Sequence, residues 1–113
     1  MDCIFCSILK KEIPSKTVYE DDYCYAFHDI NPQMPVHVIV IPKKHIPSLA
    51  DVGEEDGIYL EKVLFACKKV AQITGIDKDG YRVVTNIGEN GAQSVKHLHF
   101  HVLGGKKMAE QIV

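Results

Sequence analysis

The chain has 113 residues, of which 46% are apolar and 25% are charged, and its formal net charge is −2. This length and balance predict one globular domain over residues 1–113, large enough to bury a core. The negative charge argues against a protein that binds nucleic acid through a basic surface, because such a protein must neutralise many phosphates. The sequence has no apolar run near the ~20 residues of a membrane helix, and no basic lead-in or small-residue cleavage site at its start. We therefore expect a cytoplasmic protein that does not bind membranes.

The first part of the chain predicts a short helix followed by three strands. The helix covers Cys3–Lys10 and ends before Pro14. The strands are expected at Thr17–Glu20, Tyr23–His28 and Val36–Ile41. Two prolines make Asn31–Pro35 a loop, and the β-branched residues after it favour a buried strand that stops at Pro42.

The second part predicts one long helix and two more strands. The helix covers Glu54–Thr74 and stops at Gly75. Its apolar stripe, at three- and four-residue spacing, consists of Leu60, Val63, Leu64, Cys67, Val70, Ala71 and Thr74. Strands are expected at Tyr81–Thr85 and Val95–Leu103, closed by Gly104. The pattern predicts an α+β fold whose mainly antiparallel sheet is a meander of short strands.

Three histidines alternate in the last predicted strand. His97, His99 and His101 share one face of an extended strand, and the apolar residues between them point to the core. A solvated polar face, a three-histidine zinc site and nucleophilic catalysis all fit this spacing. A neutral imidazole is a good nucleophile near pH 7, and a neighbouring histidine can protonate a leaving group.

The segment before this strand favours a phosphate ligand. Gly91–Ser94 is a small polar turn whose backbone N–H groups and Ser94 hydroxyl can cradle an anion. Asn86, at the end of the preceding strand, adds an amide donor. Neutral donors of this kind suit a phosphate in a slightly acidic domain.

The chain has four cysteines, and two of them are spaced as C-x-x-C. Cys3 and Cys6 are compatible with small buried residues, with a redox pair or with half of a zinc site. A zinc site needs two more ligands. Cys24 and Cys67 are expected in the core, the latter because it lies on the helix stripe.

These residues carry a resemblance to a known family. The segment His97–Leu103, with three histidines each followed by an apolar residue, resembles the signature of the histidine-triad (HIT) superfamily. The blocks Gln93–Lys96, Asp29–Pro32 and His37–Ile46 resemble its bacterial-type nucleotide-binding branch, often called Hint. The similarity runs from Cys3 to about Met108.

The resemblance implies the HIT-like fold, a five-stranded antiparallel meander with one long helix and a short N-terminal helix. It also implies a purine nucleoside phosphoramidase, which splits a nucleoside monophosphate from an amine through a covalent nucleotidyl-histidine and needs no metal for the reaction. His99 is then the nucleophile, and His101 contacts the phosphate and assists the leaving group. His37 lies behind His99 and fixes its tautomer.

The same resemblance implies a set of nucleotide-binding residues. Asn86 and Ser94 bind the α-phosphate in the turn that includes Gln93, and Asp29 accepts hydrogen bonds from both ribose hydroxyls. The purine pocket is lined by Ile4, Phe5, Ile8, Phe27, His28 and Ile30.

A structural zinc ion and a dimer are also implied. Some bacterial relatives complete such a cysteine pair with the histidine of the Pro-Lys-Lys-His segment and the first triad histidine, which here gives Cys3, Cys6, His45 and His97 as ligands. Members of the branch are mostly two-fold dimers that join through the long helix and a sheet edge. Ile58, Phe65 and Ile73 lie outside the main helix stripe and are compatible with such a contact.

The sequence departs from the family pattern in three places. Ala92 stands where a glycine is common, and Lys96 resembles the diadenosine-polyphosphate hydrolase branch. The tail Lys106–Val113 is short and lacks a tryptophan found in some relatives. Hydrolysis of dinucleoside polyphosphates therefore stays open as an alternative, as does a nucleotide-binding interaction module with little catalysis.

Overall fold

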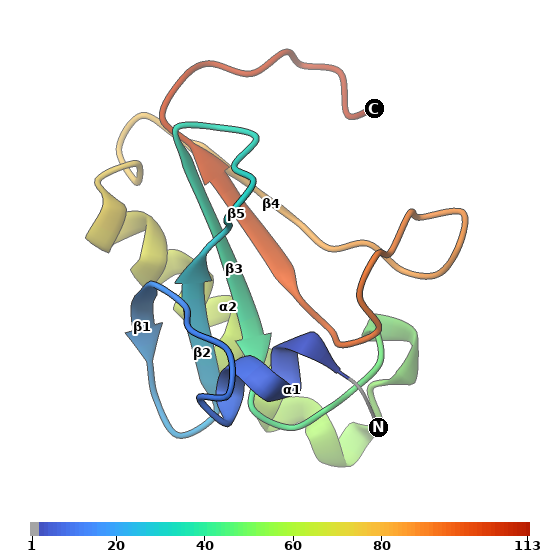
Figure 1. Ribbon diagram of the computed structural model, residues 1–113. Coiled ribbons are helices and arrows are strands. Elements are labelled where there is room, and N and C mark those ends of the chain that lie inside the picture. The colour runs from blue at the N-terminus through green and yellow to red at the C-terminus, as the bar shows by residue number, and fades with distance from the viewer. Residues whose placement is uncertain (1–2) are drawn as a thin grey trace.

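A five-stranded antiparallel sheet forms the centre of the protein, for which a computed structural model describes residues 3–113 (Figure 1). Its strands are β1 (Thr17–Glu20), β2 (Cys24–His28), β3 (Val36–Pro42), β4 (Tyr81–Val84) and β5 (Phe100–Gly104). They lie in the order β1-β2-β3-β5-β4. The first three strands form the expected meander, whereas β4 forms the far edge and β5 returns between β3 and β4.

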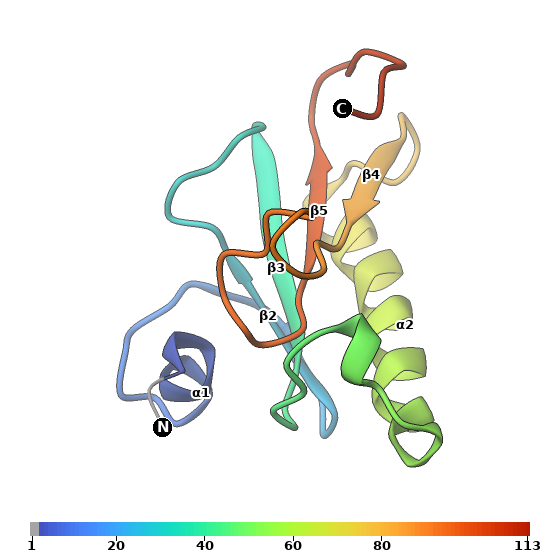
Figure 2. The same cartoon turned by 90° about the vertical axis from the view of Figure 1, so that its right-hand side faces the viewer.

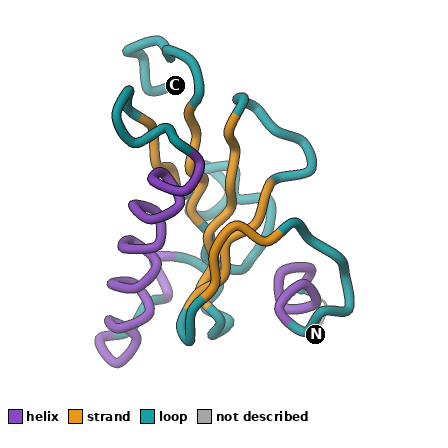
Figure 3. The backbone as a smooth tube through the Cα atoms, turned by 90° about the vertical axis from the view of Figure 1, so that its left-hand side faces the viewer, coloured by secondary structure: helices purple, strands orange, loops and turns teal. Residues whose placement is uncertain are grey.

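Two helices cover opposite faces of this sheet (Figures 2 and 3). The short helix α1 spans Ile4–Leu9, and the long helix α2 spans Gly57–Thr74. The predicted start of the long helix at Glu54 is a 3₁₀ turn that leads into α2. Gly75 ends α2 with a φ of 79°, in the left-handed region that glycine adopts without a Cβ penalty.

Strand alternation divides the core into two apolar clusters. In β2, Cys24 and Ala26 pack toward α2, while Tyr25 and Phe27 pack toward α1. The α1-side cluster comprises Cys3, Phe5, Ile8, Tyr25, Phe27, Ile39 and Ile41. Successive strand residues point to opposite faces, so one short sequence supplies both clusters.

The prediction that Leu64 belongs to the buried stripe of α2 is wrong. Leu64 is 50% exposed, whereas Ala66 is buried in the stripe. At about 100° per residue, the helix carries Leu64 to the margin of the buried face. The three residues expected outside the stripe, Ile58, Phe65 and Ile73, are exposed.

The last strand is shorter than predicted, because its first five residues do not join the ladder. Pairing of β5 with β3 ends at Phe100 and Val40. Before it, the Leu98 N–H donates to the Ile46 carbonyl at 2.6 Å, and the Thr85 hydroxyl donates to the His99 carbonyl at 2.7 Å. Loop and side-chain partners therefore replace strand partners around the first two triad histidines.

Among residues 3–113, no helix combines the length and apolar character needed to cross a membrane.

Candidate active site and metal centre

The triad histidines lie on the α1 face of the sheet, even though only His101 belongs to a strand. Leu98, Phe100 and Val102 pack in the α2-side cluster, as the alternation predicts. His97 and His99 are buried on the other face, and His101 is partly exposed there. The extended backbone thus preserves the alternation without ladder hydrogen bonds.

One hydrogen bond fixes the tautomer of His99. Its Nδ1 lies 2.7 Å from the backbone carbonyl oxygen of His97. A carbonyl oxygen only accepts, so Nδ1 carries the proton and Nε2 of the neutral ring keeps its lone pair. His99 therefore has the tautomer that a nucleophile acting through Nε2 requires.

His37 contacts His101, which corrects the predicted contact with His99. The Nε2 atom of His37 lies 2.8 Å from Nδ1 of His101 and 3.3 Å from the Asp29 carboxylate. The register explains this pairing, because His101 is opposite Ile39, two residues beyond His37 on the same face of β3.

The protons of this His37–His101 pair follow from a backbone contact. The Gln33 N–H donates to Nδ1 of His37 at 3.0 Å, so the proton of the neutral His37 ring lies on Nε2. His37 then donates to Nδ1 of His101, and the remaining N–H of His101 lies on Nε2. His101 consequently presents a donor N–H at Nε2, whereas His99 presents a lone pair at its Nε2.

Burial keeps these imidazoles neutral near pH 7. It lowers the pKa of His101 to about 4, with smaller contributions from His99 and His37. Burial also lowers the pKa of His37 and of His99, while the Asp29 carboxylate opposes the shift in both and the His97 carbonyl opposes it in His99. A neutral His99 keeps its lone pair available.

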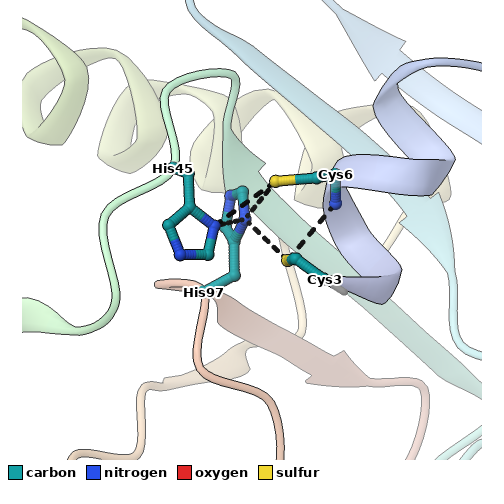
Figure 4. Close-up of side chains that lie close together, drawn as sticks. All are labelled: Cys3, Cys6, His45 and His97. Carbon is teal, nitrogen blue, oxygen red and sulfur yellow. Dashed lines mark hydrogen bonds between the residues drawn. The ribbon is translucent and has the colours of Figure 1, made fainter. Parts of the chain in front are cut away.

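A second group of side chains includes the first triad histidine, His97, together with Cys3, Cys6 and His45 (Figure 4). The ligand atoms of Cys3, Cys6, His45 and His97 all lie within 4.8 Å of one another. His45 Nδ1 and His97 Nδ1 are 3.1 Å apart, and Cys6 Sγ lies 3.3 Å and 3.6 Å from them. Tetrahedral zinc bonds of the usual lengths place such atoms about 3.3 to 3.8 Å apart, so this donor set fits zinc.

A backbone carbonyl also prepares His97 as a ligand. Nε2 of His97 lies 3.0 Å from the Pro42 carbonyl oxygen, so the proton lies on Nε2 and the Nδ1 lone pair faces the two cysteines. Lys44, next to His45, pairs with the buried carboxylate of Asp56, which ties this segment to the start of α2.

The same reasoning rejects a metal at Asp29, His37 and His101, whose ligand atoms are similarly close. The Gln33 N–H occupies Nδ1 of His37, so the Nε2 atom that faces the group carries a proton. A protonated nitrogen has no lone pair for a metal. This group is therefore a hydrogen-bonded chain.

The predicted phosphate turn is braced by its own side chains. Gln93 accepts from the Gly88 N–H and donates to the Pro47 and Val95 carbonyls, so its amide is engaged within the protein. Asn86 Nδ2 donates to the Gly91 carbonyl at 2.7 Å, and Ser94 is exposed. Gln93 thus contributes to the shape of the turn.

The structure places the residues predicted to line a purine pocket in three different surroundings. Phe5, Ile8 and Phe27 are buried in the α1-side cluster. His28 and Ile30 line an open cleft of about 760 Å³, together with Asp29 and His37. Ile4 is half-exposed on α1 and does not line this cleft.

Sequence reasoning missed several supporting groups. Gln33, Pro42 and Thr85 act through backbone atoms or a hydroxyl on the histidine segments. Ser15 and Lys16 line the same cleft as Asp29. Backbone partners leave no signal in residue type, and Ser15 and Lys16 reach the cleft only because β1 lies beside β2.

Known proteins resemble this chain in sequence and in fold. Residues 10–108 match the HIT domain family. The chain belongs to the HIT family. A HIT-like protein of Synechocystis sp. is 50% identical over 105 residues, which cover 93% of this chain and 91% of that protein.

Solved structures of other HIT proteins share the fold. A HIT family hydrolase from Clostridium thermocellum superposes with a TM-score of 0.96 at 45% identity, over 99% of this chain and 97% of that one. A histidine triad nucleotide-binding protein from Candida albicans superposes with a TM-score of 0.82 at 35% identity, over 99% of this chain and 87% of that one.

Proposed function

We propose that this HIT protein is a nucleotide-binding hydrolase that releases a purine nucleoside monophosphate from an amine. The observation that carries the proposal is the 2.7 Å contact of His99 Nδ1 with the His97 carbonyl, which leaves Nε2 as a free nucleophile. The names of the Clostridium thermocellum hydrolase and the Candida albicans nucleotide-binding protein support the two parts of the proposal.

In the first step, His99 Nε2 attacks the α-phosphorus, and the bond from phosphorus to the amine nitrogen breaks. The electron pair of that bond goes to the leaving nitrogen, which takes a proton from His101. A bound anionic phosphate raises the pKa of His101 from its low value, because a nearby opposite charge favours the imidazolium. The product of this step is a nucleotidyl-His99 intermediate.

In the second step, water attacks the same phosphorus and the bond to His99 Nε2 breaks. His101, now neutral, accepts the proton of the water. The nucleoside monophosphate leaves, and both histidines return to their starting protonation states. His37 orients His101 through the 2.8 Å contact between their rings. The imidazoles perform both steps without a metal.

Nucleotide recognition is assigned to the cleft and the turn beside the histidines. Asp29 accepts ribose hydroxyls, and its Oδ1 is oriented by the Asn31 N–H at 2.8 Å. Asn86 and Ser94 contact the α-phosphate. The purine lies against His28 and Ile30, of which Ile30 is 91% exposed and gains burial when a base covers it.

We assign a structural zinc ion to Cys3, Cys6, His45 and His97. The donor atoms fit tetrahedral zinc, and a closed set of four protein ligands leaves no position for substrate. The zinc fastens α1 to the segments after β3 and before β5. The expected cytoplasmic location suits this assignment, because a reducing compartment keeps thiols available as zinc ligands.

A homodimer is the partner state that the surface favours. Phe65 and Ile73 are more than half exposed on α2, next to the half-exposed Leu64. Val83 is also exposed, on the edge strand β4. A second copy of the chain can bury this apolar helix face and pair with this open strand edge in a symmetric interface.

The experiment that tests the activity compares two leaving groups. We expect faster turnover of lysine-linked or tryptamine-linked adenylate than of diadenosine tetraphosphate. The variant His99→Ala should lose turnover by at least about 10³-fold and keep nucleotide binding. Faster hydrolysis of diadenosine tetraphosphate would transfer the assignment to the polyphosphate class, and retained turnover in His99→Ala would reject His99 as nucleophile.

A further inference from the structure

Phe5 lies between the predicted zinc site and the proposed nucleophile. Its ring meets the His99 ring edge-on, with centroids 5.1 Å apart and an interplanar angle of 80°. It meets His97 in the same way at 5.9 Å and 75°. Phe5 has 6% of its surface exposed and packs in the α1-side cluster, whereas the resemblance implied that it lines the purine pocket.

The position of Phe5 depends on the two cysteines that flank it. Phe5 lies in α1, a helix of six residues. Isolated helices of fewer than about 12 residues are marginal in water, so α1 needs external attachment. Cys3 accepts the Cys6 N–H at 3.4 Å, and both thiols face His97 and His45 (Figure 4). A metal that binds these thiols therefore also fixes the turn that carries Phe5.

A second connection passes through His97. Its ring belongs to the cysteine–histidine group, while its carbonyl oxygen holds the Nδ1 proton of His99. A rotation of the His97 backbone that followed loss of the metal would weaken the hydrogen bond that selects the His99 tautomer. The two connections meet at the imidazole of His99, one through ring contact with Phe5 and the other through its Nδ1 and the His97 carbonyl.

We propose that Phe5 is a positioning residue for His99, and that metal at Cys3, Cys6, His45 and His97 holds both Phe5 and the His97 carbonyl in place. The inference rests on the proposed hydrolase and zinc site. It makes the metal a control on the reaction rate in addition to a structural fastener. Removal of the metal releases the His99 ring.

A His99 ring that is no longer held in position should change kcat and KM in different ways. A nucleophile displaced by about 1 Å loses on the order of 10- to 100-fold in rate. The proposed nucleotide contacts at Asp29 and Ile30 lie in the cleft, which does not include Phe5. The kcat value should therefore fall while KM changes little.

The test compares Phe5→Leu with Leu9→Ala, a matched truncation on the same helix. Leu9 is partly buried against the same cluster. For each protein, with and without Zn²⁺, two measurements are made: kcat and KM on an adenylated amine, and the tautomer of His99 from two-bond ¹H–¹⁵N correlation spectra. The spectra need no substrate, so they remain informative if the protein hydrolyses no nucleotide.

We expect one tautomer, protonated at Nδ1, in the zinc-loaded wild type and in Leu9→Ala. Phe5→Leu and the zinc-free wild type should show averaged tautomers and a 10- to 100-fold lower kcat. Equal effects of Phe5→Leu and Leu9→Ala would overturn the inference, because they indicate general loss of packing. An unchanged His99 tautomer after verified zinc removal would also overturn it. Absence of turnover in the wild type, with the expected spectra, would reject the hydrolase and leave the coupling supported.

Discussion

The backbone carbonyl of His97 accepts the Nδ1 proton of His99 at 2.7 Å, while the ring of His97 turns its own Nδ1 toward Cys3 at 3.4 Å. Two adjacent sites thus share one residue, the first through its backbone and the second through its side chain. The three alternating histidines are therefore not equivalent. His99 and His101 belong to the proposed reaction site, and His97 belongs to the metal group.

The metal group predicts one zinc ion per chain, visible by elemental analysis of protein purified without added zinc. Cys6→Ser should lose the metal, because it removes one thiolate from a set of four ligands. At free zinc 100 to 1,000 times the dissociation constant, zinc should raise the free energy of unfolding by about 2.7 to 4.1 kcal/mol.

A matched control for the metal comes from the other cysteines. Cys24→Ala should retain zinc, since Cys24 bonds to Asp21 and lies in the α2-side cluster. Burial raises the pKa of both Cys24 and Cys67 to about 12, so neither thiol should react with a thiol reagent in the folded protein. Reduced protein that neither contains nor takes up zinc would contradict the site.

The buried histidines predict that stability falls in mild acid. The pKa of His101 is about 4 in the folded protein and 6.5 when unperturbed. Between these values the unfolded chain takes up a proton that folded His101 resists, so the free energy of unfolding decreases as the pH falls from about 6.5 toward about 4.

To isolate this effect, the free energy of unfolding of His101→Gln is compared with that of the wild type by denaturant unfolding at several pH values. The variant should show a shallower decrease over the same interval, because one titrating group is gone. The metal ligands are the same in both proteins, so their contribution to the pH dependence cancels when the two stability curves are subtracted. Parallel stability curves for the two proteins would mean that His101 titrates normally.

Ala92 predicts a stabilising substitution in the proposed phosphate turn. Its φ of 60° lies in the left-handed region, which costs a residue with a Cβ about 1 to 2 kcal/mol. Ala92→Gly should therefore raise the free energy of unfolding by about 1 kcal/mol in urea titrations. A destabilised Ala92→Gly would show that the alanine methyl group makes a contact worth more than the strain.

At the neighbouring position, Gly91, we predict that a substitution lowers stability. A Cβ at Gly91 would clash with the backbone carbonyl oxygen of Ile87, so Gly91→Ala must displace the turn. We expect lower stability and weaker nucleotide binding, measured by calorimetry. Wild-type affinity in Gly91→Ala would argue against the turn as the phosphate site.

The exposed α2 face predicts a dimer that one charge disrupts. Phe65→Asp should yield monomers in sedimentation experiments, because a buried unpaired carboxylate is costly at an apolar interface. Ile13→Asp, an exposed position in the loop after α1, should leave the dimer intact. A monomeric wild type, or a dimeric Phe65→Asp, would remove this face as the interface.

Much of the fold could be predicted because it depends on residue type and period. Alternation in β3 and around β5 separates His37, His99 and His101 from the apolar residues that face α2. Both expected helices form, although α2 begins at Gly57 and not at Glu54. The length of β5 could not be predicted, because Ile46 and Thr85 supply partners from distant loops.

The sequence and its resemblance named residues that lie together in the structure, but they did not predict the contacts among them. The four metal-group residues come together as the resemblance implied. The partner of His37 depends on strand register, which places it against His101. The tautomers depend on backbone atoms of Gln33, Pro42 and His97, whose side chains give no hint of these contacts.

The central claim is that His99 becomes covalently nucleotidylated, and mass spectrometry after rapid acid-free quenching tests it most directly. The protein is mixed with an adenylated amine and digested. We predict AMP attached to the peptide that contains His99 in wild type. In His101→Gln the same adduct should form more slowly and decay more slowly, because the variant lacks both the proton donor of the first step and the proton acceptor of the second. Turnover without any AMP on His99 in either protein, or AMP attached to another residue, would contradict the account.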